Sequence, residues 1–152
     1  MTTKASRVLV VDDDPDIRTI VRLNLGLSGM ETDEAANGSE ALEKLASDEW
    51  DACVLDLAMP QTDGMTALKV LRDNGRLEDL VVVVLSATSS PKRAIEGLEL
   101  GAHAHLTKPF SPAAVAGVLQ ELIDLSPDAR DARRRSMLSR AGEMERLGMT
   151  TV

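Results

Sequence analysis

Short continuous hydrophobic runs alternate along this chain with longer stretches in which apolar residues recur near helical spacing. Three of the runs, Arg7 to Val11, Asp51 to Leu55 and Leu80 to Leu85, are rich in β-branched residues and largely apolar at successive positions. Strands that are buried on both faces of a parallel sheet have this pattern. Two weaker strands are predicted at residues 30–35 and 103–107, so the pattern indicates five strands.

A helix is predicted after each of these strands. The apolar spacing that indicates the helices covers residues 17–27, 39–45, 65–74, 91–100 and 113–125. An order of strand then helix, repeated five times, predicts a doubly wound α/β fold with helices on both faces of a parallel sheet. The loops that follow the strands then meet at the carboxyl edge of the sheet, where such folds place their functional sites.

Local signals mark the starts of several helices. Asp14–Pro15, Ser90–Pro91 and Ser111–Pro112 each offer a capping oxygen followed by a proline, whose fixed φ suits the first helical position. Asn37–Gly38 and Asp63–Gly64 indicate two further turns that lead into helices. Gly64 is therefore interpreted as a turn glycine.

The composition favours one compact domain. The chain has 152 residues, of which 43% are hydrophobic and 28% charged. It shows no apolar run of about 18 residues that could span a membrane, and its first residues lack the cleavage site of a secretory signal. We therefore expect a cytoplasmic protein. The single Cys53 lies in an apolar run and is predicted to be a buried structural thiol.

Charge is distributed unevenly along the chain. The formal net charge is −8, yet the last 27 residues hold six arginines against four acidic residues. The body is therefore acidic and the tail is mildly basic. Because the phosphates of nucleic acids demand Lys and Arg, an acidic body argues against a nucleic-acid partner and favours binding of a cation.

Five polar side chains are predicted to meet at the carboxyl edge of the sheet. They are Asp12 and Asp13 after the first strand, Asp56 after the third, Ser86 after the fourth and Lys108 after the fifth. Two carboxylates about 4 Å apart repel each other by roughly 4 kcal/mol at an effective dielectric near 20, so something must offset the repulsion. Three carboxylates suit Mg²⁺, which takes oxygen ligands and is commonly shared with a phosphate.

Four segments in chain order resemble the receiver domain of two-component response regulators, over about residues 7–125: VLVVDDDP, DACVLDLAMPQTDGM, VVVLSA and GAHAHLTKPF. The resemblance implies a flavodoxin-like, five-stranded sheet in the order 2-1-3-4-5. It implies that Asp56 is the phosphoacceptor and that Asp12 and Asp13 are the carboxylate ligands of Mg²⁺, or of Mn²⁺ in its place. The Ser86 hydroxyl would bind the phosphoryl group and Lys108 would be its charge partner.

The same resemblance implies further features. The backbone carbonyl of Ala58 would be a metal ligand, and the peptide bond between Lys108 and Pro109 would be cis. A histidine kinase or a histidine phosphotransfer protein would supply the phosphoryl group. A downstream protein would contact the fourth helix, fifth strand and fifth helix, within residues 90–125. The protein would then be a signalling module that catalyses only its own phosphorylation and dephosphorylation.

One position departs from the family pattern. Three residues before Lys108 the family usually has Tyr or Phe, whereas this chain has His105. In the family that ring moves inward as the Ser or Thr hydroxyl approaches the phosphate, so Ser86 and His105 are the predicted switch. Titration of His105 near neutral pH is a hypothesis, and a half-exposed residue without a switching role is the alternative. His103 is expected to be a plain surface residue.

Residues 126–152 are predicted to form a helical extension of the receiver domain 1–125, or a truncated linker. Arg133 interrupts the helix's apolar stripe and Gly142 weakens the helix, so its amphipathicity is weak. The stripe consists of Ala129, Met137, Ala141, Met144 and Leu147. Docking on the body, pairing with a second copy or another partner, and connection to an output domain all remain open. We expect that the segment docks or dimerises.

Other functions are compatible with an acidic sheet edge. A magnesium-dependent aspartyl phosphohydrolase would usually carry a second acid two residues after its nucleophile, where this chain has Ala58. A flavodoxin-like cofactor binder would need a phosphate-binding loop after the first strand, where the acidic segment DDDPD stands. A receiver-like adaptor without phosphorylation is a further alternative, and the complete acidic set argues against it.

Overall fold

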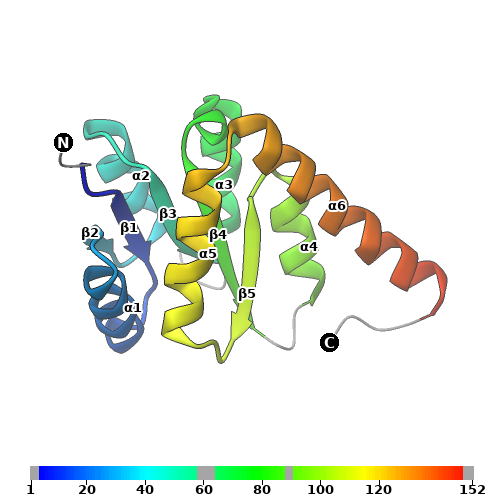
Figure 1. Ribbon diagram of the computed structural model, residues 1–152, viewed down its shortest axis with the longest axis horizontal. Helices are drawn as coiled ribbons and strands as arrows, with labels where there is room; N and C mark the ends of the chain where they lie inside the picture. Colours follow the sequence, from blue (N-terminus) through cyan, green and yellow to red (C-terminus); the bar gives the residue numbers. More distant parts are fainter. Residues whose placement is uncertain (1–3, 58–63, 88–90, 149–152) are drawn as a thin grey trace.

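The computed structural model describes residues 4–57, 64–87 and 91–148 (Figure 1). All of its strands belong to one parallel sheet in the order β2-β1-β3-β4-β5, which confirms the predicted order. The strands are β1 (Arg7–Val11), β2 (Glu31–Ala35), β3 (Ala52–Asp56), β4 (Val81–Ala87) and β5 (Ala104–Lys108).

A helix follows each strand, and a sixth α-helix follows α5 in the described part of the chain. The predicted bounds of the first five helices agree with the observed ones to within two residues, whereas the pattern does not predict the 3-10 helix η1. The helices are α1 (Pro15–Leu27), α2 (Gly38–Ser47), α3 (Gly64–Asp73), η1 (Arg76–Glu78), α4 (Pro91–Glu99), α5 (Pro112–Asp124) and α6 (Pro127–Arg146). Among the described residues, no helix combines the length and the apolar character needed to cross a bilayer.

The sheet separates two hydrophobic cores. Figure 1 shows α1 and α5 on one face of the sheet and α2, α3 and α4 on the other. Val8 and Val10 of β1 pack with α1 and α5, whereas Leu9 and Val11 pack with α2 and α3. Because both faces are covered, the strands are apolar at successive positions. Cys53 is fully buried, as predicted, and burial raises the pKa of its thiol to about 12.

Side-chain caps fix the starts of two helices. Asp14 accepts a hydrogen bond from the backbone N–H of Asp16 at 2.9 Å, which confirms it as the cap of α1. Asn37 caps α2 in the same way. Ser111 precedes α5, but its hydroxyl makes no capping hydrogen bond, so that part of the prediction is wrong. The predicted cap Ser90 lies outside the described residues.

His103 is buried, so its prediction as a surface residue is wrong. Only 6% of it is exposed, and its Nδ1 accepts a hydrogen bond from the backbone N–H of Val82 at 3.0 Å. Desolvation, together with the nearby Arg130 and Arg134 of α6, lowers the pKa of His103 to about 4. A charged imidazolium could not accept the hydrogen bond from Val82, so the neutral ring is the form that stabilises this end of the sheet.

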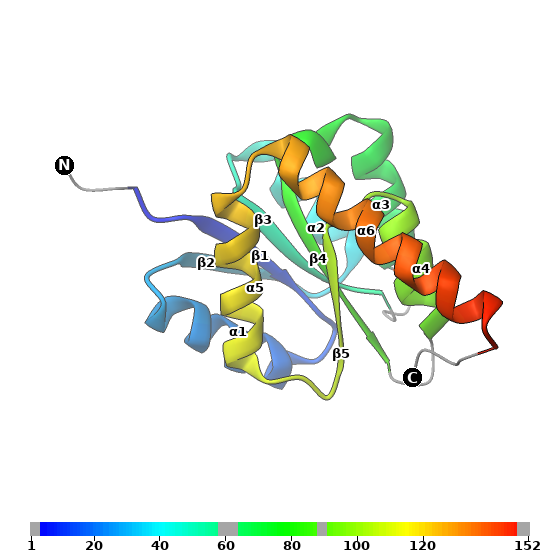
Figure 2. The same ribbon diagram turned by 45° about the vertical axis from the view of Figure 1, so that its right-hand side comes forward.

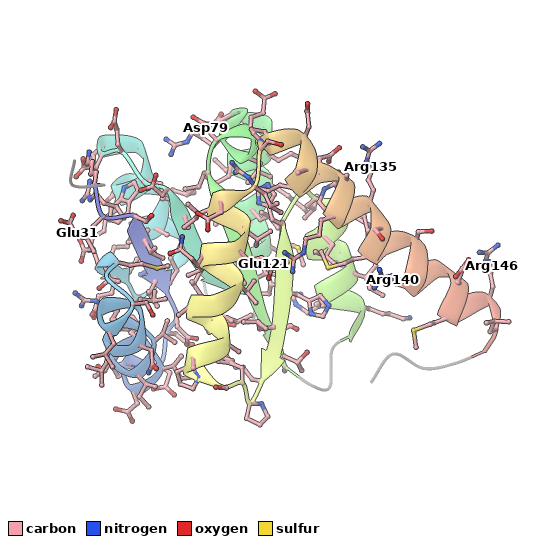
Figure 3. All side chains as sticks on the ribbon, viewed as in Figure 1. Glu31, Asp79, Glu121, Arg135, Arg140 and Arg146 are labelled. Carbon is pink, nitrogen blue, oxygen red and sulfur yellow. The ribbon has the colours of Figure 1, made fainter. Side chains whose placement is uncertain are left out.

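The helix α6 packs against α4 rather than lying free. Arg134 donates a hydrogen bond to the Leu98 carbonyl near the end of α4 at 3.0 Å, and Arg133 forms an ion pair with Glu121 of α5 at 3.0 Å. Figure 2 shows α6 crossing α4 and then extending beyond the sheet. Of the predicted apolar stripe, Ala129, Met137, Ala141 and Met144 are half-buried, whereas Leu147, just after α6, is 75% exposed. Arg135 points away from the body (Figure 3).

Candidate functional site

Four strands bring the predicted site residues to one edge of the sheet. Asp12 directly follows β1, Asp56 ends β3, Ser86 lies near the end of β4 and Lys108 ends β5. The first three residues are almost completely buried, at 0%, 1% and 2% exposed respectively, whereas Asp13 is exposed. The cluster therefore combines two buried acids with one exposed acid.

The three aspartates form a single acidic cluster. Asp12, Asp13 and Asp56 each offer a carboxylate oxygen, and these oxygens all lie within 4.8 Å of one another. The Lys108 ammonium lies 3.0 Å from Asp12 Oδ2 and 3.2 Å from Asp56 Oδ2. Although partial burial opposes the charged form, the bonds to both carboxylates raise the pKa of Lys108. The ammonium thus offsets part of the repulsion between the acids.

Burial strongly perturbs the ionisation of Asp12. Desolvation raises its pKa to about 6, and repulsion from Asp56 adds to this shift. The backbone N–H of Asp14, which donates to Asp12 Oδ1 at 3.0 Å, and the charge of Lys108 act in the opposite direction. An ionised Asp12 is therefore held in the metal-free site at a cost in free energy.

The cluster meets the requirements of a divalent cation. Among the described residues, the buried Asp12 Oδ2 accepts no well-directed hydrogen bond, although the Lys108 ammonium faces it. Mg²⁺ prefers oxygen ligands such as these three closely spaced carboxylates. A bound cation would also satisfy the buried Asp12 Oδ2. Ala58, whose carbonyl is the fourth predicted ligand, lies outside the described residues.

Ser86 lies beside the phosphoacceptor position predicted for Asp56. The strands β3 and β4 pair so that Asp56 is opposite Leu85, the residue directly before Ser86. The backbone N–H of Leu57 donates to the Leu85 carbonyl at 2.9 Å, which fixes this register beyond the end of β3. Ser86 in turn pairs with Thr107 of β5. The sheet thus keeps Ser86 next to the acidic cluster.

The remaining predicted features lie on β5 and just beyond it. The peptide bond between Lys108 and Pro109 is cis, as the resemblance implies. His105 is exposed, and partial desolvation lowers its pKa below the ordinary value of histidine. Its role as part of a switch stays a prediction.

Gly64 closely approaches the backbone of Asp56, while Asp63 of the predicted turn lies outside the described residues. Gly64 is the first residue of α3, and a Cβ atom placed on it would lie 1.9 Å from the carbonyl oxygen of Asp56. No side chain fits there, because the nearest atoms belong to the backbone of the central strand β3. The interpretation from sequence missed this close approach, since a glycine needed for it and a turn glycine look alike in a sequence.

Two arginines that the sequence pattern does not single out contact the site's backbone. Arg18 of α1 donates to the Asp12 carbonyl at 2.7 Å, and Arg93 of α4 donates to the Leu57 carbonyl at 2.6 Å. Leu57 follows Asp56 directly, so α4 touches the chain next to the predicted phosphoacceptor. No motif marks these arginines, because their partners are carbonyl groups, which every residue has.

Comparison with known proteins finds one family throughout. The family model described as response regulator receiver domain matches residues 8–120. The response regulator MprA of Mycobacterium ulcerans (strain Agy99) is 40% identical over 134 residues, which are 88% of this chain and 50% of that protein. MprA of Mycobacterium avium (strain 104) is 38% identical over 131 residues, covering 86% of this chain and 57% of that one. The chain thus spans about half the length of these curated relatives.

Solved structures agree with the family match. The receiver domain of the Francisella response regulator 1452 superposes with a TM-score of 0.71 at 36% identity, covering 78% of this chain and 96% of that one. The chemotaxis response regulator CheY4 of Vibrio cholerae superposes with a TM-score of 0.71 at 33% identity, covering 78% and 98%. The fold similarity therefore covers nearly the whole of each neighbour.

Proposed function

Since this chain belongs to the response regulator receiver domain family, we propose that it accepts a phosphoryl group on Asp56 from a histidine kinase or a histidine phosphotransfer protein. The observation that carries this proposal is the acidic cluster at the carboxyl edge of the sheet. Asp12, Asp13 and Asp56 lie within reach of one ion, and Lys108 bridges Asp12 and Asp56. A receiver is a signalling module, so the conformational consequence of phosphorylation is its output.

The residues of the site divide the chemistry among them. One Asp56 carboxylate oxygen attacks the phosphorus of the phosphohistidine; the new P–O bond forms an acyl phosphate as the P–N bond breaks and its electron pair returns to the imidazole. Lys108 neutralises negative charge on the transferring oxygens, and the Ser86 hydroxyl donates a hydrogen bond to one of them. When bound by the three aspartates, Mg²⁺ or Mn²⁺ would supply further neutralisation at the same oxygens.

The proposed output involves Ser86, His105 and the helix α4. A phosphoryl group draws in the Ser86 hydroxyl, and the movement of that loop changes the binding of a downstream protein. Arg93 and Gly97 of α4 support this direction, because Arg93 binds the Leu57 carbonyl and a Cβ atom at Gly97 would be 3.4 Å from Leu57 Cδ1. A shift in the position of Leu57, the residue after Asp56, would therefore act directly on α4.

The helical extension 126–152 is part of this proposal. Because α6 packs on α4, it shares the predicted partner face, residues 90–125, with any downstream protein. A partner that binds α4 would either include α6 in its interface or displace it. We propose that a change in the position of α4 on phosphorylation also changes the position of α6, and that this alters the surface offered to a downstream protein.

Intact-mass spectrometry after incubation with acetyl phosphate tests phosphorylation of Asp56. With Mg²⁺ the wild-type chain should gain the mass of one phosphoryl group, and it should gain none with a chelator. Asp56→Asn should gain none under either condition, because an amide cannot act as the nucleophile. The control Asp16→Asn removes an exposed acid of α1 outside the cluster and should be phosphorylated like the wild type.

The same experiment separates the alternatives. No adduct and no consumption of acetyl phosphate would support a receiver-like adaptor and contradict the proposal. Consumption without an adduct would point to an aspartyl phosphohydrolase. An adduct that persists in Asp56→Asn would place the phosphoacceptor at another residue.

A further inference from the structure

We propose that Arg18 is a positioning residue for the acidic cluster: it holds the segment Asp12–Asp13 in the conformation that binds a divalent cation. The inference rests on the proposed function, because it concerns the same metal site. It adds a residue from α1 that does not contact the ion itself and belongs to none of the motifs at the strand ends.

Arg18 connects the segment after β1 to the edge strand β2. Its guanidinium donates to the Asp12 carbonyl at 2.7 Å and to Glu34 Oε1 at 3.0 Å. Its side chain is only 13% exposed, so both bonds are largely shielded from solvent. The backbone N–H of Asp12 donates to the Ala35 carbonyl at 3.2 Å. The backbone of Asp12 is therefore tied to β2 twice, once directly and once through Arg18.

The orientation of the Asp12 carbonyl affects the position of the next metal ligand, Asp13. It belongs to the planar peptide unit that joins Asp12 to Asp13, so its orientation sets the direction in which the Asp13 backbone begins. The side chain of Asp12 also holds this turn, because its Oδ1 accepts a hydrogen bond from the backbone N–H of Asp14. Arg18 adds a hydrogen bond to the backbone carbonyl of the same residue. Without it, the exposed Asp13 would lose the constraint that keeps its carboxylate within reach of the ion.

Electrostatics and positioning make opposite predictions for Arg18. A positive charge near a cation site disfavours the cation, so removing that charge would by itself strengthen Mg²⁺ binding. Removing a residue that positions the ligands would weaken binding, since loss of groups that orient metal ligands typically costs about 10- to 100-fold in affinity. The direction of the change therefore distinguishes the two roles.

Arg22 provides a matched control on the same helix. It pairs with Oε2 of Glu34, the carboxylate that Arg18 also binds, and its Nε donates to Thr32 Oγ1 at 3.1 Å. Its described hydrogen bonds go to Glu34 and Thr32, whereas those of Arg18 include the Asp12 carbonyl. Replacing either arginine by glutamine removes one charge and one partner of Glu34.

The test is calorimetric titration of the full chain with Mg²⁺ in wild type, Arg18→Gln, Arg22→Gln and Arg18→Lys. We expect Arg18→Gln to weaken Mg²⁺ binding about tenfold, and Arg22→Gln to bind as tightly as wild type or slightly more tightly. Arg18→Lys keeps the charge but cannot reproduce the two-pronged geometry, so its affinity should lie between those of wild type and Arg18→Gln. The melting temperatures of Arg18→Gln and Arg22→Gln are measured as well. If the two variants are equally destabilised, a loss of Mg²⁺ affinity in Arg18→Gln alone cannot be attributed to general instability.

A measurement without metal tests whether Arg18 orders this segment, separately from whether the site binds Mg²⁺. Hydrogen exchange of the Asp14 amide, which donates to Asp12 Oδ1, should be faster in Arg18→Gln than in Arg22→Gln in the presence of a chelator. Unchanged or tighter Mg²⁺ binding in Arg18→Gln would overturn the positioning role. If the wild type takes up no Mg²⁺, the proposed metal site fails, and unchanged Asp14 exchange would then overturn the inference separately.

Discussion

Gly64→Ala is expected to lower the free energy of unfolding by about 3 kcal/mol and to disturb the site at Asp56. The added Cβ would lie 1.9 Å from the Asp56 carbonyl oxygen, 2.8 Å from its carbonyl carbon and 2.9 Å from Leu57 Cα. These are backbone atoms of the sheet's central strand, which is paired on both sides and buried. Neither α3 nor β3 can therefore move away cheaply. Urea unfolding followed by circular dichroism measures the change.

Gly117→Ala is the matched control for this prediction. Gly117 is exposed in the middle of α5, and a Cβ atom there would have nothing within 4 Å. Because alanine forms helices better than glycine, Gly117→Ala should stabilise the protein by about 0.5–1 kcal/mol. If Gly64→Ala unfolds at the same urea concentration as Gly117→Ala, the close approach between α3 and Asp56 is wrong.

Asp12→Asn is expected to stabilise the metal-free protein at pH 7 while it abolishes binding of Mg²⁺. Burial raises the pKa of Asp12 from 3.8 to about 6, so the folded protein binds a proton more tightly than the unfolded chain does. Between about pH 4 and pH 6 the stability therefore falls as the pH rises. A shift of this size corresponds to roughly 3 kcal/mol, which is an upper bound on the gain because asparagine also loses the ion pair with Lys108.

Unfolding in a chelator at pH 4 and pH 7 measures this effect. The gain from Asp12→Asn should be present at pH 7 and absent near pH 4, where Asp12 is protonated in the wild type as well. Asp13→Asn is the control, because it removes the same charge at an exposed position and should weaken Mg²⁺ binding without a comparable gain in stability. A less stable Asp12→Asn at pH 7 would show that the buried charge is adequately compensated without a metal.

His103 adds an opposing pH dependence in the same range. Its pKa is lowered from 6.5 to about 4, so its neutral ring contributes stability that is present above about pH 6.5 and lost as the pH falls toward 4. In the wild type the contributions of Asp12 and His103 therefore partly cancel between pH 4 and pH 6. Asp12→Asn removes one of them, and its stability should fall more steeply on acidification than that of the wild type.

The elements and the members of the acidic cluster could be predicted because they depend on local pattern. A strand covered on both faces must be apolar at successive positions, and a helix on one face must be apolar at helical spacing. Once these elements alternate, the carboxyl ends of the strands share one edge. Asp12, Asp56 and Lys108 therefore had to come together there, and the structure brings them within salt-bridge distance.

Only the tertiary structure shows the contacts between distant elements that no local sequence pattern marks. His103 is buried just before β5, where Leu77 of η1 and Arg130 and Arg134 of α6 lie near its ring, and nothing in its own segment indicates these neighbours. Arg18 and Arg93 bind backbone carbonyls, whose positions depend on how helices from distant parts of the chain dock. The packing of α6 on α4 includes a hydrogen bond from the Arg134 guanidinium to the Leu98 carbonyl, for which the sequence has no local signal. The sequence by itself thus determined the strands, the helices and the members of the acidic cluster, because periodicity and strand ends are local properties, whereas the order of the strands was implied by the family resemblance and shown by the structure. The tertiary structure alone decided which arginines bind the backbone beside that cluster and that α6 packs on α4, because those contacts depend on the relative placement of whole elements.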